Sequence, residues 1–306
     1  MKRILVTGAS GFIGRFVLPL LVEDDFEVHA LLWRGETSQI AGVHRHKVDL
    51  MDNHALVSLL TDLQATHLLH LAWYTEHEKF WNSDKNLQWV ACSLNLLNRF
   101  VGLGGKRVVM AGSCAEYDWN EEYCSEMNTP CNPATLYGTS KYALFKIAES
   151  YCLQNHVKFS WGRIFFPYGP GDAASRFVPT VINGLLRQES IACSEGKQVR
   201  DLMYVEDVAS AFVALLKSEL SGAVNIASGE SYSLRQIGEI IKRLIDGEGQ
   251  IRFGAIPGQD SEPVLLTADV KRLRDGSNWR PAYHLEAGLT KTIDWWKHNQ
   301  GKSVAD

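Results

Sequence analysis

The sequence predicts an α/β protein built on a Rossmann-type, doubly wound parallel sheet, with a smaller, discontinuous α/β domain toward the C-terminus. Short apolar runs alternate with amphipathic stretches along the first half of the chain, which is the pattern of strand–helix units with parallel strands. A glycine-rich run at residues 8–14 (GASGFIG) directly follows the first apolar run. A sheet of this kind binds ligands at the carboxyl ends of its strands, so we expect the functional residues there.

The elements of the first half follow from the spacing of their apolar residues. Continuous apolar runs predict strands, and apolar residues three and four apart predict helices. Pro19 is the expected irregularity of the first helix. We expect strands at residues 2–7, 27–33, 67–72, 107–111 and 158–165, and helices at residues 12–22, 56–63, 87–101 and 137–154.

From residue 167 the chain becomes richer in turn residues, beginning with YGPGD at 168–172. A strand-like segment at 201–205 and a helix from 206 to 217 indicate a return to the first domain. Further helices or short strands are expected at residues 178–187, 224–226, 234–246, 251–253 and 289–297. We therefore predict a dinucleotide-binding Rossmann domain of residues 1–166 plus about 200–222, and a substrate-binding domain of residues 167–199 and 223–306.

The composition argues against several classes of function. A chain of 306 residues with 45% hydrophobic content suffices for a sizeable core, and its net charge is only −4. No basic run resembles a nucleic-acid or membrane patch, and no apolar stretch approaches the ~18 residues of a membrane span. The six cysteines form no C-x-x-C pair and no metal-like spacing with histidine. We expect a cytoplasmic protein with reduced thiols, without a metal, a nucleic-acid partner or a membrane.

The glycine-rich run is the candidate cofactor loop. Glycine permits a tight turn and lets backbone N–H groups approach a pyrophosphate, while the helix N-terminus adds a partial positive charge. A plain strand–turn–helix connection is the alternative, and the strand before and helix after the run favour dinucleotide binding over it. The candidate contacts are Gly8, Ser10, Gly11, Phe12, Ile13 and Gly14.

The identity of the dinucleotide depends on the end of the second strand. NAD-binding proteins usually carry a carboxylate there, but residues 28–34 (VHALLWR) end in Arg34. A guanidinium pairs with the 2′-phosphate of NADPH, and Arg15 would contact the same phosphate. The alternative is that both arginines are merely exposed. We predict NADPH, with NADH less favoured, and we expect Asp49 and Leu50 near the adenine and Asp52 as the cap of the next helix.

Tyr137 and Lys141 form the candidate proton-transfer pair. Residues four apart lie on one face of a helix, where an ammonium would stabilise the phenolate and lower the tyrosine pKa. This spacing also arises by chance. Ser113, which lies 24 residues before Tyr137 near the end of a strand, strengthens the interpretation.

These motifs, with His70-Leu71-Ala72, Arg163 and the string RDLMYVEDVA at 200–209, resemble the extended short-chain dehydrogenase/reductase family from residue 2 to about 297. Most members act on nucleotide sugars as 4-epimerases, 4,6-dehydratases or 4-keto reductases. The resemblance implies that Tyr137 exchanges a proton with the sugar oxygen, Ser113 hydrogen-bonds that oxygen, and Lys141 binds the nicotinamide ribose. It also implies cofactor contacts by Leu71 and Ala72, a diphosphate contact by Arg200, and further substrate contacts by Trp73, Cys114, Phe166 and Arg176.

Departures from the family motifs narrow the subclass. Dehydratases carry an Asp-Glu pair after the catalytic serine, where this chain has Cys114 and Ala115; Glu116, one residue further along a strand, is expected to face away. Combined epimerase-reductases need a cysteine and a histidine where Ala115 and Arg176 stand. The family's asparagine on the helix after the fourth strand is replaced by Trp89, for which Asn86 is the expected substitute.

The chain thus resembles the nucleotide-sugar 4-ketoreductase branch, such as CDP-abequose and dTDP-fucose synthases. We predict NADPH-dependent reduction of the C4 ketone of a nucleoside-diphosphate-4-keto-6-deoxyhexose, in polysaccharide (O-antigen) or glycoside sugar biosynthesis. The alternatives are an NAD-dependent nucleotide-sugar 4-epimerase and a non-catalytic NADP(H)-binding sensor or scaffold. By the same resemblance we expect a homodimer through the helices at about 87–101 and 137–154.

Overall fold

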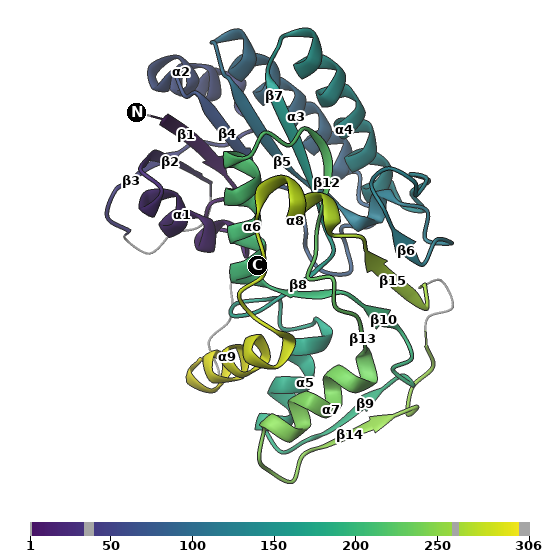
Figure 1. Cartoon of the computed structure of the whole chain (residues 1–306). Coiled ribbons are helices and arrows are strands. Elements are labelled where there is room, and N and C mark those ends of the chain that lie inside the picture. Colours follow the sequence, from purple (N-terminus) through teal and green to yellow (C-terminus); the bar gives the residue numbers. More distant parts are fainter. Residues whose placement is uncertain (1, 34–39, 259–262, 300–306) are drawn as a thin grey trace.

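The computed structural model describes residues 2–33, 40–258 and 263–299. Over these residues, seven strands form one sheet in the order β12-β7-β5-β4-β1-β2-β3, and every pairing in it is parallel. This sheet lies in the upper half of Figure 1 and confirms the predicted Rossmann-type fold class. Its strands are β1 (Lys2–Thr7), β2 (Phe26–Leu32), β3 (Val43–Lys47), β4 (His67–His70), β5 (Arg107–Ser113), β7 (Lys158–Ile164) and β12 (Gly222–Ile226).

Helices cover both faces of the sheet, because successive side chains of each strand point to opposite faces. In β1, Ile4 and Val6 contribute to the core on one face, whereas Leu5 contributes to the core on the other. The first face carries α1 (Gly14–Glu23), α6 (Val205–Lys217) and α8 (Lys271–Ser277), and the second carries α2 (Asn53–Leu63), α3 (Lys85–Gly102) and α4 (Leu136–Gln154). None of the helices within the described ranges is long and apolar enough to cross a membrane.

A second layer of structure lies below the sheet in Figure 1 and has its own apolar core. Helices α5 (Phe177–Leu186), α7 (Leu234–Leu244) and α9 (Leu285–His298) pack there with the paired strands β9 (Ser190–Cys193) and β14 (Gln250–Phe253). Short strands connect the two layers: β6 (Tyr123–Cys124), β8 (Phe166–Tyr168), β10 (Val199–Arg200), β11 (Leu202–Tyr204), β13 (Tyr232–Ser233) and β15 (Leu265–Ala268).

The structure adds β9, β15 and α8 to the expected elements, and three further differences concern the cofactor loop and the boundary between the two layers. The first helix begins at Gly14 rather than at residue 12, because the Gly11 N–H donates to Gly8 O and residues 11–13 form a turn. The strand-like segment expected at 201–205 is shorter in the structure: β11 spans Leu202–Tyr204, and Asp201 separates it from β10 (Val199–Arg200). The Rossmann layer extends to Ile226, beyond the expected residue 222, because β12 pairs with β7 and buries its apolar residues beside α6.

Candidate active site

The glycine-rich loop joins the end of β1 to α1 in a conformation that requires glycine. Gly8 has φ +68°, and a Cβ on it would lie 2.7 Å from the backbone nitrogen of Ala72, after β4. A Cβ on Gly14 would lie 2.0 Å from the carbonyl oxygen of Gly8. The loop therefore brings the N-terminus of α1 close to the ends of β1 and β4. Among the described residues no side chain caps this helix, so its first N–H groups fit an anionic pyrophosphate.

The remaining predicted cofactor residues surround this loop. Leu71 N–H donates to Thr7 O at 3.2 Å, and Ala72 N–H donates to the Thr7 hydroxyl at 3.3 Å, which fixes the segment after β4. Leu50 is buried after β3, and Asp49 accepts the Met51 N–H at 2.9 Å. Asp52 accepts N–H groups of the first turn of α2, so its predicted capping role is confirmed.

Of the two arginines predicted to bind a 2′-phosphate, only Arg15 is among the described residues. Arg15 donates from its guanidinium to the carbonyl oxygens of Pro170 at 3.0 Å and Gly171 at 2.8 Å, and so ties the start of α1 to the turn that opens the second layer. Arg34 lies outside the described residues.

His70 of the family-like His-Leu-Ala motif is a buried connector rather than a proton donor. Its Nδ1 lies 2.7 Å from the Thr7 hydroxyl, and its Nε2 lies 2.8 Å from the Ser93 hydroxyl. Burial lowers the pKa of His70 to about 3, so the imidazole is neutral at physiological pH. It joins β1, β4 and α3 beneath the cofactor loop.

The structure brings together the three candidate catalytic residues. Ser113 ends β5, Tyr137 lies in the first turn of α4, and Lys141 follows one helical turn later. Thr135 caps α4 by accepting the Gly138 N–H at 3.1 Å. A Cβ on Gly138 would lie 2.2 Å from Ala115 O, so this glycine allows α4 to approach the turn after β5. Gly138 was not among the predicted site residues. A glycine directly after Tyr137 could have indicated that α4 approaches another backbone segment closely.

The expected lowering of the Tyr137 pKa is not found in this structure. Burial raises the pKa of Tyr137, and a hydrogen bond with the Ser113 side chain offsets part of the rise. Burial also lowers the pKa of Lys141 to about 7. The Lys141 ammonium donates to Ala111 O at 2.9 Å and lies 3.8 Å from the centre of the Trp73 ring. The prediction was wrong because the spacing of two residues in the sequence does not reveal how deeply they are buried. With a raised pKa, the Tyr137 phenol is protonated at neutral pH and is able to donate a proton.

Aromatic side chains from the segment after β4 enclose the Tyr137 phenol. Its ring centre lies 4.8 Å from that of Phe80, 5.8 Å from Trp81 and 6.5 Å from Trp73, each at an edge-to-face angle. Asn86 supports this wall, since it accepts from the Trp73 indole at 2.9 Å and donates to Phe80 O at 2.7 Å. Of these aromatic residues, only Trp73 was predicted to line the site. The frequent aromatic residues between positions 73 and 81 could have indicated the others.

The other candidate substrate residues lie around the same centre. Burial raises the pKa of the Cys114 thiol, so it is a poor proton donor. Arg176 precedes α5, 3.5 Å from the Asp172 carboxylate, and its charge opposes a small part of the rise that burial causes in the pKa of Tyr137. Arg200 donates to Val199 O at 2.9 Å and lies 5.4 Å from the Phe166 ring centre.

The chain is similar along most of its length to proteins of known activity. The family model described as "NAD dependent epimerase/dehydratase family" matches residues 4–227. UDP-glucuronic acid decarboxylase 1 of Xenopus tropicalis is 27% identical over 314 residues, which cover 97% of this chain and 72% of that protein. CDP-abequose synthase of Salmonella muenchen is 25% identical, over 95% of this chain and 97% of that protein. UDP-glucose 4-epimerase of Thermus thermophilus, solved with NAD, has a TM-score of 0.83 at 24% identity, covering 97% of this chain and 99% of that one.

Proposed function

Because the chain belongs to the NAD dependent epimerase/dehydratase family of nucleotide-sugar enzymes, we propose that it reduces the C4 ketone of a nucleoside-diphosphate-4-keto-6-deoxyhexose with NADPH. The observation that carries the proposal is a buried, protonated Tyr137 hydrogen-bonded to Ser113, beside positions that lack the acid and base of a dehydratase. Cys114 is a buried thiol with a raised pKa, and Ala115 has no titratable group. What this site offers is the donation of one proton.

The residues have distinct roles in this reaction. The glycine-rich loop and Lys141 would hold the dinucleotide, which supplies a hydride to C4 when it is bound. The Ser113 hydroxyl donates a hydrogen bond to the ketone oxygen and stabilises the negative charge that develops there. Tyr137 transfers its phenolic proton to that oxygen, so that ketone, hydride and proton together give the alcohol. Lys141 stabilises the phenolate that remains.

The choice of NADPH rests on the absence of a carboxylate at the end of β2. The strand ends at Leu32 and is followed by Trp33 and Arg34, so no negative charge there would repel a 2′-phosphate. We assign Arg34 as the principal 2′-phosphate contact.

A nucleotide-sugar 4-epimerase is the second candidate, and one contact favours it. Arg15 donates to two backbone carbonyls and is thereby drawn away from a 2′-phosphate. A 4-epimerase would keep a bound NAD and would consume no net cofactor. A non-catalytic NADP(H) sensor would not need a phenol enclosed with Ser113 and Lys141.

The test is NADPH consumption with a freshly prepared 4-keto-6-deoxy sugar linked to dTDP or CDP. Tyr137→Phe should lower turnover by about 10²–10⁴-fold and leave NADPH affinity within about threefold, because it removes only the proton donor. Tyr142→Phe, on the same helix, is the matched control and should retain wild-type turnover. Copurified NAD with interconversion of UDP-sugars, or NAD-dependent turnover of UDP-glucuronate without NADPH oxidation, would overturn the proposal.

We also propose a homodimer through α3 and α4. Leu87, Ile147 and Leu153 on these helices are exposed, by 57%, 48% and 77% respectively. Light scattering should give twice the monomer mass for the wild type. Ile147→Asp should shift the mass toward the monomer, whereas a wild-type protein that is monomeric at micromolar concentration would contradict this arrangement.

A further inference from the structure

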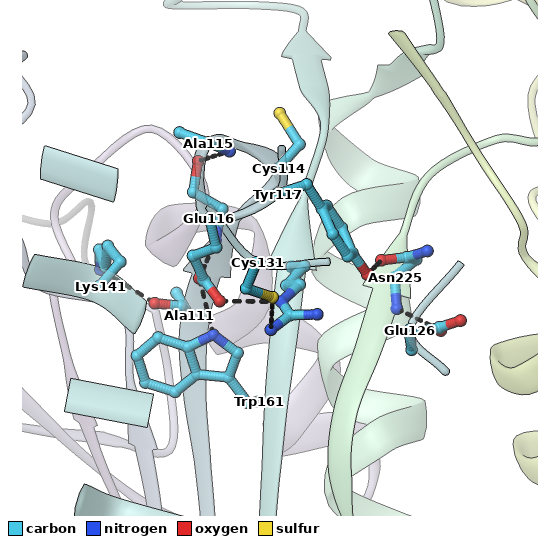
Figure 2. Close-up of polar contacts among 12 residues, drawn as sticks. Ala111, Cys114, Ala115, Glu116, Tyr117, Glu126, Cys131, Lys141, Trp161 and Asn225 are labelled. Carbon is cyan, nitrogen blue, oxygen red and sulfur yellow. Dashed lines mark hydrogen bonds and ion pairs between the residues drawn. The ribbon is translucent and has the colours of Figure 1, made fainter. Parts of the chain in front are cut away.

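A buried carboxylate lies directly beneath Ser113. Glu116 is fully buried; its Oε1 accepts the Ser113 backbone N–H at 2.8 Å and the Trp161 indole N–H at 2.8 Å. Its Oε2 accepts from Arg163 Nε at 2.8 Å. Figure 2 shows the Glu116 carboxylate above the Trp161 indole, with Ala111 and Lys141 to its left. Both carboxylate oxygens are therefore held by hydrogen-bond donors.

The direction of Glu116 was expected from a strand that continues past Ser113, and this premise was wrong because β5 ends at Ser113. Residues Cys114–Glu116 form one turn of 3₁₀-helix, in which the Ser113 hydroxyl accepts the Ala115 N–H at 3.2 Å and Glu116 returns to the Ser113 N–H. This reciprocal pair is a capping box. It places both the backbone and the hydroxyl of Ser113.

The surroundings of Glu116 are shaped for a carboxylate. A Cβ on Gly112 would lie 2.0 Å from the Trp161 indole nitrogen and 2.7 Å from Glu116 Oε1, so only glycine permits this contact. Arg163 is itself buried and packs over the Tyr117 ring, 4.4 Å from its centre. A buried ion pair contributes little net stability, because the cost of desolvating both charges offsets their attraction. The Glu116–Arg163 pair therefore matters chiefly for the charge and the geometry that it provides at the site.

The charge of Glu116 acts on Lys141. Within the described residues, Glu116 is the one charged group that raises the pKa of Lys141, against the larger effect of burial. The other groups around the ammonium are the Ala111 carbonyl of β5, the Trp73 and Trp161 rings, and His70 of β4, whose own pKa Lys141 lowers. Tyr137 lies on the same helix and is protonated. Glu116, which is itself paired with Arg163, therefore favours the ammonium form of Lys141 together with the Ala111 carbonyl and the Trp73 ring.

We propose that Glu116 is a positioning residue for the reduction, a role that rests on the proposed function: its carboxylate holds the Ser113 backbone, and its negative charge favours the ammonium form of Lys141. Both of its carboxylate oxygens are held by protein donors, so its role is to position other groups rather than to take part in the chemistry. Its two effects are separable, because the hydrogen bond to Ser113 requires the length of the side chain and the effect on Lys141 requires its charge.

The first experiment removes the negative charge of Glu116 and measures the protonation of Lys141 in the protein without cofactor or substrate. In Glu116→Gln, the ¹³Cε resonance of Lys141, identified by its loss in Lys141→Met, should titrate about one pH unit below the wild-type midpoint of about 7. Glu126→Gln is the matched control, since this half-buried carboxyl accepts the Asn225 N–H at 2.7 Å and should leave the midpoint unchanged. A folded Glu116→Gln protein with the wild-type midpoint would overturn the electrostatic role.

The second arm keeps the charge and shortens the side chain. In Glu116→Asp the carboxylate no longer reaches Ser113, so the Ser113 amide should exchange faster with deuterium and kcat should fall about tenfold with KM for NADPH unchanged. Wild-type amide protection together with wild-type kcat would refute the positioning role, and this arm decides if Glu116→Gln does not fold. The NMR titration and amide exchange need no substrate, so they remain informative if the enzyme proves to be a 4-epimerase.

Discussion

Replacing Gly14 by alanine tests the role of the cofactor loop with a defined steric change. The added Cβ would lie 2.0 Å from Gly8 O and 2.8 Å from Ala9 Cα, and both neighbours are backbone atoms. Since ordinary contact begins at 3.4 Å, either the start of α1 or the Gly8 carbonyl must move by about 1.4 Å. That movement displaces the N–H groups that we assign to the pyrophosphate.

The expected loss is large for binding and moderate for stability. The loss of hydrogen bonding from these N–H groups to a charged pyrophosphate costs about 1.5–3 kcal/mol, so the Kd for NADPH should rise by up to about 100-fold. Overpacking against backbone should lower the free energy of unfolding by about 1–3 kcal/mol. Isothermal titration with NADPH and with NADH measures the first quantity, and urea unfolding measures the second.

Gly102→Ala is the matched control. Gly102 ends α3, and a Cβ added to it meets nothing within 4 Å. This variant should bind NADPH as the wild type does, with its free energy of unfolding unchanged or raised by less than about 1 kcal/mol. A folded Gly14→Ala protein with the wild-type Kd for both dinucleotides would show that the loop does not hold the cofactor.

Three further predictions concern buried polar groups. Burial lowers the pKa of His70 to about 3, so the stability that the neutral imidazole contributes to the fold is present above about pH 6.5 and is lost as the pH falls. In urea unfolding, the free energy of unfolding of the wild type minus that of His70→Gln should decrease by about 2 kcal/mol from about pH 8 to about pH 5. Burial raises the pKa of Asp172 to about 6, so its protonated form stabilises the fold below about pH 4 and this contribution is lost as the pH rises through 6. Asp172→Asn should remove a dependence of about 2 kcal/mol between about pH 4 and about pH 6 from the free energy of unfolding, and an unchanged pH profile would contradict the burial argument. Ser113→Ala should reduce kcat by about 10²–10³-fold, a barrier increase of about 3 kcal/mol, with little change in NADPH affinity; a smaller loss would mean that Ser113 does not stabilise the developing charge.

Much of the fold was predictable because it depends on local pattern. The alternation of apolar runs and amphipathic stretches indicated the parallel sheet, and Gly8 and Gly14 marked the turn where only glycine fits. Asp52 was recognised as a helix cap from its place before an apolar-periodic segment. The position of β12 in the sheet was missed because a short strand such as 222–226 carries no information about its partner.

The candidate site was predictable in composition but not in its electrostatics. Spacing placed Tyr137 and Lys141 on one face of α4, and the family motifs added Ser113. Spacing does not report burial, which raises the pKa of Tyr137 and lowers that of Lys141. The direction of Glu116 depended on where β5 ends, which neighbouring residues alone do not specify.

By itself, therefore, the sequence determined the fold class, the glycine loop and the types of side chain at the carboxyl ends of the strands, since these follow from periodicity and local backbone conformation. Only the tertiary structure decided that Arg15 binds the turn at Pro170 and Gly171, and that Glu116 lies beneath Ser113. These contacts join segments far apart in the chain or depend on how a strand ends. Burial and long-range pairing set the protonation of Tyr137 and Lys141, because desolvation depends on everything packed around a group rather than on its neighbours in sequence.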